Sequence, residues 1–498
     1  MWDRVADAHR QITDRPEGTL HGVLDPTGAW IWWFDDERGS EFGVWRVEPF
    51  QPGGTEWPGS IHLPPAYSAG LALGRDLAVV GSSDDDGSRI HVVRDSEADE
   101  VYLWDGPGKA LWPSGWSRAP GDQRLLISHE RTGRPRPMIW ESETNATQDL
   151  EFDLPGEVEA SWYPDGRSVL LVRDHRSRAE LYRFDLETAT LEHIDTEPGS
   201  VTDARVRPGG EVWYAWTRSS TPAQIRTPSG VLLTPPGEPA PHGVAYSDHD
   251  VDGVHVFVAE PPGAEQPHPT IFIVHGGPTW QDRDAFAPVV QAWVDHGFAV
   301  VLVNYRGSTG YGTAWRDALE GNPGLTELED IAKVHDWAVA SGLADPERVV
   351  LSGGSWGGYL ALLGLGTQPE RWSLGVAAVP VADYVAAFVD EMEPLKAFDR
   401  SLFGGSPPDI PEVYRKRSLI TYVEQVRVPV MILAGENDPR CPIRQIDNYL
   451  ARLRELGLPH EVYRFDAGHG SLVIEETLQQ LAAEISFVAE HLGTPPPL

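Results

Sequence analysis

Turn-forming residues recur at nearly constant intervals through the first half of the chain, and this regularity constrains the fold more than any other feature of the sequence. The turns at Pro26, Gly74, Pro120, Pro164 and Pro208 lie 48, 46, 44 and 44 residues apart. Each turn precedes a short β-type run, such as "TGAWIWWFDD" or "RSVLLVRDHRSRAELYRFDL". Repeats of about 40 to 50 residues with several short strands each are typical of β-propeller blades. The spacing predicts about five such blades, with a β-sandwich as the alternative.

The first dozen residues follow a different pattern. Trp2, Val5, Ala6 and Ile12 fall on one face if the segment is helical. This spacing predicts a short N-terminal helix that packs outside the repeats.

The pattern of the chain changes after a Pro- and Gly-rich join at residues 234–243. A hairpin signal at Asp252-Gly253 leads into apolar runs without alternation, each followed by a helical pattern, as in "TIFIVHGG" and "FAVVLVNYRG". Such runs indicate a mostly parallel sheet that is buried on both faces. We therefore expect a β-propeller domain over residues 1–240, including the short helix, and an α/β domain over residues 241–498.

Charge and cysteine content argue against several classes of function. The 40 Lys and Arg residues against 75 Asp and Glu residues give a net charge of −35, which repels nucleic acid and anionic membrane surfaces. The single cysteine, Cys441, excludes an internal disulfide and a zinc cluster of cysteines. The N-terminus lacks a signal-peptide pattern, and no run of 18 apolar residues occurs. We expect a cytoplasmic protein without metal or organic cofactor, and a homo-oligomer is left open.

The motif Gly353-Gly354-Ser355-Trp356-Gly357 lies between an apolar strand-like run and an apolar helix-like run. A strand, a sharp turn and a helix in that order expose the serine hydroxyl at the edge of the sheet, as a nucleophile elbow requires. A chain with 50 glycines contains such motifs by chance, so the motif alone fits a structural turn better than a nucleophile. Ser355 is nevertheless the candidate nucleophile, because matching residues follow later in the chain.

A serine nucleophile needs a base within hydrogen-bonding distance and an acid that orients the base. In α/β-hydrolases the acid and then the histidine follow later strands. "PVMILAGENDPRCP" ends one strand and offers Asp438, with Glu436 as the rival acid, and "VYRFDAGHGS" ends the next and offers His469. The order predicts a triad of Ser355, Asp438 and His469.

A tetrahedral intermediate also requires hydrogen-bond donors. The backbone N–H of Trp356, directly after the nucleophile, is one candidate, and the glycine-rich loop "FIVHGGP" offers Gly277 as the second. His275 in this loop has no second metal ligand at a suitable spacing, so we interpret it as a residue that shapes the loop.

Six segments together resemble the prolyl oligopeptidase family of serine peptidases, and most closely its acylaminoacyl-peptidase branch. They are "VHGGP", "VNYRGSTGYG", "GGSWGGY", "FGGSP", "GENDPRCPIRQ" and "AGHG". The resemblance covers roughly residues 243–498 and extends to the N-terminal half only through its architecture. It implies an α/β-hydrolase domain with an N-terminal β-propeller, the same triad, and oxyanion donors at Gly277 and Trp356.

The resemblance also implies a substrate contact. The family's Asp-x-Arg signature falls on Asp438-Pro439-Arg440, where the arginine holds a main-chain carbonyl of the substrate. Two features depart from the family: its propellers usually have seven or eight blades, and its dipeptidyl-peptidase branch has a tyrosine where this chain has His275. No pair of glutamates for a free N-terminus was identified.

An insertion over residues 389–403, together with Phe388 and Phe398, predicts an apolar substrate pocket, although ordinary helix core is an equal alternative. The whole pattern predicts a serine hydrolase that cleaves amide bonds of small acylated or peptidic substrates. An aminopeptidase or amidase that detoxifies an aminoacyl compound is the runner-up. A catalytically dead protein that binds partners through its propeller is the alternative of another class.

Overall fold

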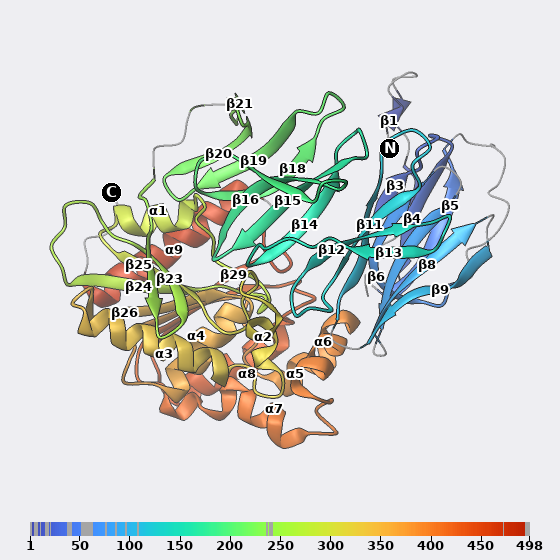
Figure 1. Cartoon of the computed structure of the whole chain (residues 1–498). Coiled ribbons are helices and arrows are strands. Elements are labelled where there is room, and N and C mark those ends of the chain that lie inside the picture. Colours follow the sequence, from blue (N-terminus) through green and yellow to red (C-terminus); the bar gives the residue numbers. More distant parts are fainter. Residues whose placement is uncertain are drawn as a thin grey trace. The chain divides into compact units, whose positions relative to one another are not determined.

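The computed structural model describes most of the chain, and Figure 1 shows its elements. The described residues are 2–3, 8–9, 11–14, 19, 21–36, 42–50, 63–74, 77–84, 87–94, 97–106, 109–235, 238, 243–471 and 473–493. The chain divides into two compact units. The first comprises Met1–Arg173, Leu181–Asp195 and Arg205–Trp213, and the second comprises Asp174–Glu180, Thr196–Ala204 and Tyr214–Leu498.

The N-terminal half forms antiparallel sheets of short strands. A seven-stranded sheet contains β3 (Gly22–Leu24), β4 (Trp30–Asp36), β5 (Phe42–Pro49), β6 (Ala66–Leu73), β7 (Ala78–Asp84), β8 (Gly87–Arg94) and β9 (Glu97–Asp105) in that order. Three four-stranded sheets follow: β10 (Leu111–Trp116), β11 (Arg124–His129), β12 (Arg136–Glu141) and β13 (Ala146–Asp149); β14 (Glu157–Trp162), β15 (Ser168–His175), β16 (Arg178–Asp185) and β17 (Thr190–Ile194); β18 (Ser200–Val206), β19 (Val212–Arg218), β20 (Thr221–Thr227) and β21 (Gly230–Leu233). Successive strands are neighbours in every one of these sheets.

The seven-stranded sheet is weakly joined in its middle. Within the described residues, β5 and β6 pair only through Phe42 with Tyr67 and Gly43 with Ala66. The strands therefore fall into five groups, β3–β5, β6–β9, β10–β13, β14–β17 and β18–β21, which agrees with the five repeats in the sequence.

The repeated turns have the same place in every group. Pro26, Gly74, Pro120, Pro164 and Pro208 each lie between the first and second strand of their group. The period in the sequence thus reflects one structural unit that repeats, and four-stranded antiparallel units of this kind are expected of propeller blades.

The helix predicted for the first dozen residues is wrong. β1 (Trp2–Asp3) and β2 (Ala8–His9) form an antiparallel pair in which Trp2 is opposite His9 and Asp3 is opposite Ala8. Val5 and Ala6 lie outside the described residues. Twelve residues are too few for a stable isolated helix, so an apolar stripe of this length does not prevent strand pairing.

The second unit is built on an eight-stranded sheet with the order β22-β23-β25-β24-β26-β27-β28-β29. Its strands are β22 (Ser247–Val251), β23 (Val254–Ala259), β24 (His268–Val274), β25 (Ala299–Asn304), β26 (Ala344–Gly354), β27 (Leu374–Ala378), β28 (Val430–Gly435) and β29 (His460–Phe465). The pairs β22–β23 and β23–β25 are antiparallel, and all other neighbouring pairs are parallel. Asp252 and Gly253, with φ of 51° and 88°, form the turn of the predicted hairpin.

Helices cover both faces of this sheet. They are α1 (Pro288–Asp295), α2 (Thr313–Arg316), α3 (Leu325–Ala340), α4 (Trp356–Thr367), α5 (Tyr384–Asp390), α6 (Glu393–Phe403), α7 (Pro411–Arg417), α8 (Ile443–Glu455) and α9 (Ile474–Leu492). One buried core joins the sheet to α3, α4 and α8, and a second joins it to α1 and α9. Strands buried on both faces explain the continuous apolar runs of the sequence. No helix within the described part of the chain is both long and apolar enough to span a bilayer.

Candidate active site

Ser355 lies in a sharp turn between β26 and α4. Its φ of 56° and ψ of −119° are unusual for a residue with a side chain. The turn is possible because Gly353 and Gly357 have no side chain: a Cβ atom on either residue would overlap the carbonyl oxygen of Val274. The Ser355 N–H donates to the carbonyl oxygen of Ala378 at 2.8 Å, which ties the turn to the neighbouring strand.

The structure brings Ser355, His469 and Asp438 together. His469 follows β29 and Asp438 follows β28, so both come from the carboxyl ends of parallel strands. The Nε2 atom of His469 lies 2.8 Å from the Oγ atom of Ser355, and its Nδ1 atom lies 2.8 Å from Oδ2 of Asp438. The imidazole ring therefore bridges the hydroxyl and the carboxylate, which is the geometry that a serine nucleophile and its base require.

The Asp438 carboxylate is buried and held from its other side. Its Oδ1 atom accepts hydrogen bonds from the backbone N–H groups of Arg440 at 2.8 Å and Cys441 at 2.9 Å. These two donors fix the carboxylate and leave Oδ2 directed at His469.

The rival acid, Glu436, lies elsewhere. It is exposed, and its Oε1 atom accepts a hydrogen bond from Arg464 at 3.0 Å. This ion pair occupies Glu436, so the geometry favours Asp438 as the partner of His469.

The two predicted oxyanion donors belong to segments next to Ser355. Trp356 is the first residue of α4, and the N–H groups of the first helical turn have no partner within the helix. A Cβ atom on Gly276 would lie 3.4 Å from the Cβ atom of Ser355, so this glycine loop packs directly against the nucleophile. Gly277 follows with a φ of 122°, which favours glycine. The roles of Trp356 and Gly277 remain predictions.

His275 has the surroundings expected of a residue that shapes this loop. Its ring stacks on Tyr305 with centroids 4.2 Å apart, and its Nε2 atom lies 2.9 Å from Oγ of Ser308. Burial lowers the pKa of His275 to about 4, so the ring is neutral at physiological pH. The Tyr305 hydroxyl donates to the His275 carbonyl oxygen at 2.7 Å and fixes the backbone beside Gly276.

Glu327, a buried carboxyl group next to the elbow, belongs to none of the motifs recognised in the sequence. Its Oε1 atom accepts a hydrogen bond from the indole Nε1 of Trp356 at 3.0 Å, and its Oε2 atom accepts one from the Gly324 N–H at 2.7 Å. Burial raises the pKa of Glu327 to about 8. A glutamate on the apolar face of α3 was the available signal, because a fully buried carboxyl group needs a partner.

Arg440 is exposed beside the Asp438 carboxylate. Within the described residues, its guanidinium makes no hydrogen bond or ion pair with the rest of the chain. The guanidinium therefore has donors available for a substrate carbonyl, as the prediction requires.

Phe388 and Phe398 are half-buried on α5 and α6, and both pack against the larger core of the second unit. The Phe388 ring meets the edge of Tyr414, with centroids 5.8 Å apart. These contacts suit a pocket wall and ordinary core equally, so the pocket remains a prediction.

If these rings line a substrate pocket, Phe388→Ala and Phe398→Ala should each change the preference for Phe over Ala at the cleaved residue by roughly 10-fold or more. The reason is that removal of a ring from a pocket changes the fit of a large side chain more than that of a small one. The measurement is kcat/KM on a series of substrates that differ in this residue. Lower thermal stability with an unchanged preference would show that the rings are core only.

Three potential metal ligands also meet at this site. Donor atoms of Asp438, Cys441 and His469 all lie within 4.8 Å of one another. Metal binding by Cys441 would require the thiolate, and burial raises the pKa of this thiol well above its usual value. Asp438 and His469 are already hydrogen bonded to each other, so the donor set suits proton transfer better than metal binding.

Comparison with known proteins places these features in context. Residues 285–495 match the model of the prolyl oligopeptidase family. The acylamino-acid-releasing enzyme of Rattus norvegicus is 26% identical over 375 residues, which cover 67% of this chain and 50% of the rat protein. Dipeptidyl peptidase family member 6 of Caenorhabditis elegans is 31% identical over 235 residues, 46% of this chain and 32% of that protein. The chain spans about half or less of the length of these relatives.

Solved structures match over nearly the whole chain. A puromycin hydrolase is 25% identical with a TM-score of 0.80, and the match covers 96% of this chain and 80% of the hydrolase. An acylaminoacyl peptidase in complex with Z-Gly-Gly-Phe-chloromethyl ketone has a TM-score of 0.76 at 17% identity, with 100% and 84% coverage, and shows likeness of fold alone. The predicted fold, a β-propeller followed by an α/β-hydrolase domain, is thereby confirmed.

Proposed function

The chain belongs to the prolyl oligopeptidase family of serine peptidases, and from this premise we propose that it hydrolyses amide bonds of small acylated or peptidic substrates. The observation that carries the proposal is the position of the His469 ring, which lies 2.8 Å from both Ser355 Oγ and Asp438 Oδ2.

In the proposed mechanism, His469 Nε2 takes the proton of Ser355 as its Oγ atom attacks the substrate carbonyl. Asp438 keeps the second ring proton on Nδ1 and stabilises the imidazolium that forms. The N–H groups of Trp356 and Gly277 bind the oxyanion of the tetrahedral intermediate.

Collapse of this intermediate breaks the amide bond, and His469 returns the proton to the leaving amine. The acyl group remains on Ser355 as an ester. A water molecule then gives a proton to His469 as it attacks the ester. His469 returns this proton to Oγ of Ser355 as the acid leaves, which regenerates the free serine and the neutral histidine. No step requires a group beyond these side chains, the backbone and water.

Arg440 contributes to the choice of substrate in this proposal. Its free guanidinium lies in the same loop as Asp438, where it donates to a carbonyl oxygen of an extended acyl group. Acylated N-termini supply such a carbonyl, and they carry no ammonium group that would need an acidic partner. We therefore propose acylaminoacyl compounds as the preferred substrates.

A second candidate is an amidase or aminopeptidase that acts on an aminoacyl compound. It is favoured by the similarity to puromycin hydrolase, which is 25% identical and matches 96% of the chain, whereas the acylaminoacyl peptidase of similar fold is 17% identical. The net charge of −35 would also attract a cationic substrate.

Matched substrates separate the two candidates. N-acetylated and free aminoacyl p-nitroanilides of Ala, Leu and Phe are assayed at low and high salt, because steering by net charge fades with ionic strength. We expect higher kcat/KM for the acetylated series at both salt concentrations. A preference for the free amines that persists at high salt would support the second candidate instead.

The same assay tests Arg440. Loss of a charge-assisted hydrogen bond in Arg440→Gln should lower kcat/KM for the acetylated substrates by roughly 10-fold or more. Arg415→Gln is the matched control, because Arg415 is exposed and its ion pair with Glu412 lies within α7. Equal activity of Arg440→Gln and the wild type would remove Arg440 from the proposal.

Two further expectations from the sequence remain predictions, a domain boundary near residue 240 and a cytoplasmic location, and assembly into a homo-oligomer stays open.

A further inference from the structure

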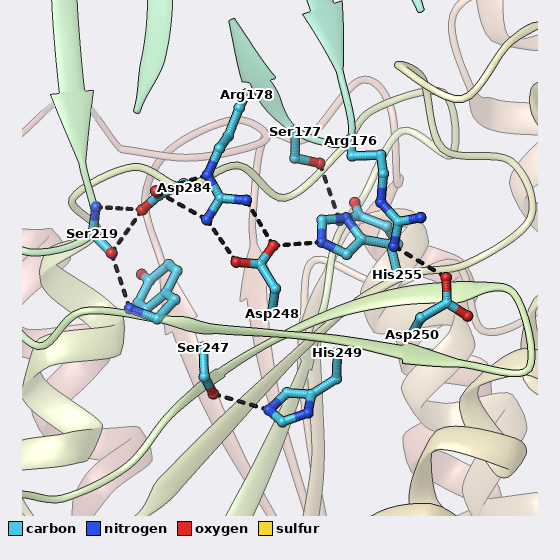
Figure 2. Close-up of polar contacts among 12 residues, drawn as sticks. Arg176, Ser177, Arg178, Ser219, Ser247, Asp248, His249, Asp250, His255 and Asp284 are labelled. Carbon is cyan, nitrogen blue, oxygen red and sulfur yellow. Dashed lines mark hydrogen bonds and ion pairs between the residues drawn. The ribbon is translucent and has the colours of Figure 1, made fainter. Parts of the chain in front are cut away.

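A buried polar network joins the turn at Asp174–Glu180 to the α/β part of the second unit. This turn comprises the end of β15, Arg176 and Ser177, and the start of β16, and Arg176 and Ser177 both have positive φ values, of 50° and 62°. Figure 2 shows Asp248 on β22 between Arg178 on one side and His255 on the other. The ion pair between Arg178 and Asp248 thus connects the turn to the hairpin of β22 and β23.

Charged groups form the outer part of this network. Arg178 makes a bidentate ion pair with Asp248, with two N···O distances of 2.7 Å, and lies 3.3 Å from Asp284. Asp284 in turn accepts hydrogen bonds from the N–H and hydroxyl groups of Ser219 at 2.9 and 2.7 Å. Bidentate pairs of this kind have well-defined geometry.

Uncharged groups form its buried inner part. The Ser177 hydroxyl, fully buried, lies 3.0 Å from Oε1 of Gln281 and 2.9 Å from the Tyr311 hydroxyl. The Tyr311 hydroxyl lies 2.6 Å from Nδ1 of His255, whose Nε2 atom lies 2.9 Å from Asp248. A continuous chain of hydrogen bonds therefore runs from Gln281 to Asp248.

Gln281 connects this network to the candidate active site. It lies four residues after Gly277, in the loop that packs against Ser355. Its amide Nε2 donates to Asp174 at 3.1 Å, so both ends of the Gln281 amide are held by the Asp174–Glu180 turn. Asn304 adds a second attachment, because its amide donates to the Ser177 hydroxyl and to the carbonyl oxygen of Asp282.

The chain of hydrogen bonds requires a definite number of protons. Its two ends, Oε1 of Gln281 and the Asp248 carboxylate, can only accept. Four links lie between these ends, and each link needs one hydrogen atom. Ser177, Tyr311 and a neutral His255 provide one each, which is one too few. With an imidazolium at His255, every link has a donor.

The groups that face His255 determine the pH at which its ring takes up this proton. Burial lowers the pKa of His255 most, the Asp248 carboxylate raises it, and Arg176 and Arg178 of the turn lower it further. The ring also meets Phe257 edge-on at 4.7 Å, and Asp250 is a more distant carboxylate of the same hairpin. Burial raises the pKa of the Tyr311 hydroxyl, so Tyr311 keeps its proton throughout. At neutral pH His255 is uncharged and one link lacks its hydrogen.

We propose that the chain Asp248–His255–Tyr311–Ser177–Gln281 positions the loop that carries Gly277, and that protonation of His255 completes this chain. Its catalytic consequence rests on the proposed function, because Gly277 matters there as an oxyanion donor. Tyr311 and Ser177 are then positioning residues. The loop is held most firmly at pH values below the pKa of His255.

The substitution Tyr311→Phe tests the inference. It removes the hydrogen bonds of Tyr311 to Ser177 and to His255. The two remaining hydrogen bonds, from Ser177 to Gln281 and from neutral His255 to Asp248, each have a donor, so neither requires protonation of His255. Hydrogen exchange of residues 276–284 is followed by mass spectrometry between about pH 5 and pH 8, with correction for intrinsic rates. In the wild type, protection should rise about fivefold on acidification, as one added hydrogen bond implies. In Tyr311→Phe, protection should be low and the rise due to His255 should be absent, whereas any response of Asp282 in the same loop, whose pKa burial raises to about 7, is shared by the two proteins.

Kinetics provide the second readout. An oxyanion donor stabilises the transition state rather than the bound substrate, so its displacement affects kcat more than KM. Tyr311→Phe should therefore lower kcat roughly 10-fold and leave KM within about twofold. The matched control is Tyr422→Phe, whose hydroxyl donates to the Lys416 carbonyl oxygen and has no part in the network. This control should match the wild type in both measurements.

The outcomes separate this inference from the proposed function. The same pH response of the loop in the wild type and in Tyr311→Phe would overturn the inference, even if the chain hydrolyses the p-nitroanilides. So would equal kcat values for the two proteins. A proton-dependent loop in a protein that hydrolyses no amide would support the positioning network and contradict the proposed function alone.

Discussion

Ser355→Ala is expected to lower kcat for amide hydrolysis by about 10⁶-fold, the loss typical of a removed serine nucleophile. Among the described residues, Ser355 provides the only hydroxyl that is hydrogen bonded to His469, and it also packs against the Gly276 loop. The measurement is steady-state turnover of the preferred p-nitroanilide at saturating concentration.

The fold of this variant should be unchanged. Serine and alanine both carry a Cβ atom, so the strain at a φ of 56° is the same for the two residues. Thermal unfolding should occur at the same temperature as in the wild type. Retained turnover in a folded Ser355→Ala protein would remove Ser355 from the nucleophile role.

Asp438→Asn should lower kcat by about 10⁴-fold, the effect of placing the histidine in the wrong tautomer. The backbone donors at Arg440 and Cys441 would retain the amide oxygen in the place of Oδ1. The amide nitrogen would then face Nδ1 of His469 and donate to it. The ring proton would move to Nε2, which could no longer accept the proton of Ser355.

Glu436→Gln is the matched control for this prediction, since it changes the neighbouring carboxylate in the same way. Glu436 pairs with Arg464 on the surface, so its loss should leave kcat within about twofold of the wild type. If Glu436→Gln were the inactive variant and Asp438→Asn the active one, the acid would have been misassigned.

Local sequence patterns predicted the architecture and the placing of the triad residues. The elbow is recognisable because Gly353 and Gly357 meet a local steric requirement beside the Val274 carbonyl. Asp438 and His469 are recognisable because each follows a strand, and parallel strands bring their carboxyl ends to one edge of the sheet.

Contacts between distant segments were not predictable in this way. Ser177 and Gln281 are separated by 104 residues, and neither belongs to a motif. Glu327 meets Trp356 across 29 residues through the packing of α3 against the elbow. The N-terminal helix failed for a different reason: Trp2 pairs locally with His9, and an apolar stripe over twelve residues is too short to establish a helix.

Labelling with a fluorophosphonate probe tests the central claim most directly, because the probe reacts with a serine only where a base and an oxyanion site activate it. We expect a single modified residue, Ser355, in the folded wild-type protein, identified by peptide mass spectrometry. Labelling should be absent in Ser355→Ala and strongly slowed in Asp438→Asn. A folded wild-type protein that shows no labelling at Ser355 would contradict the account and favour a catalytically dead binding protein.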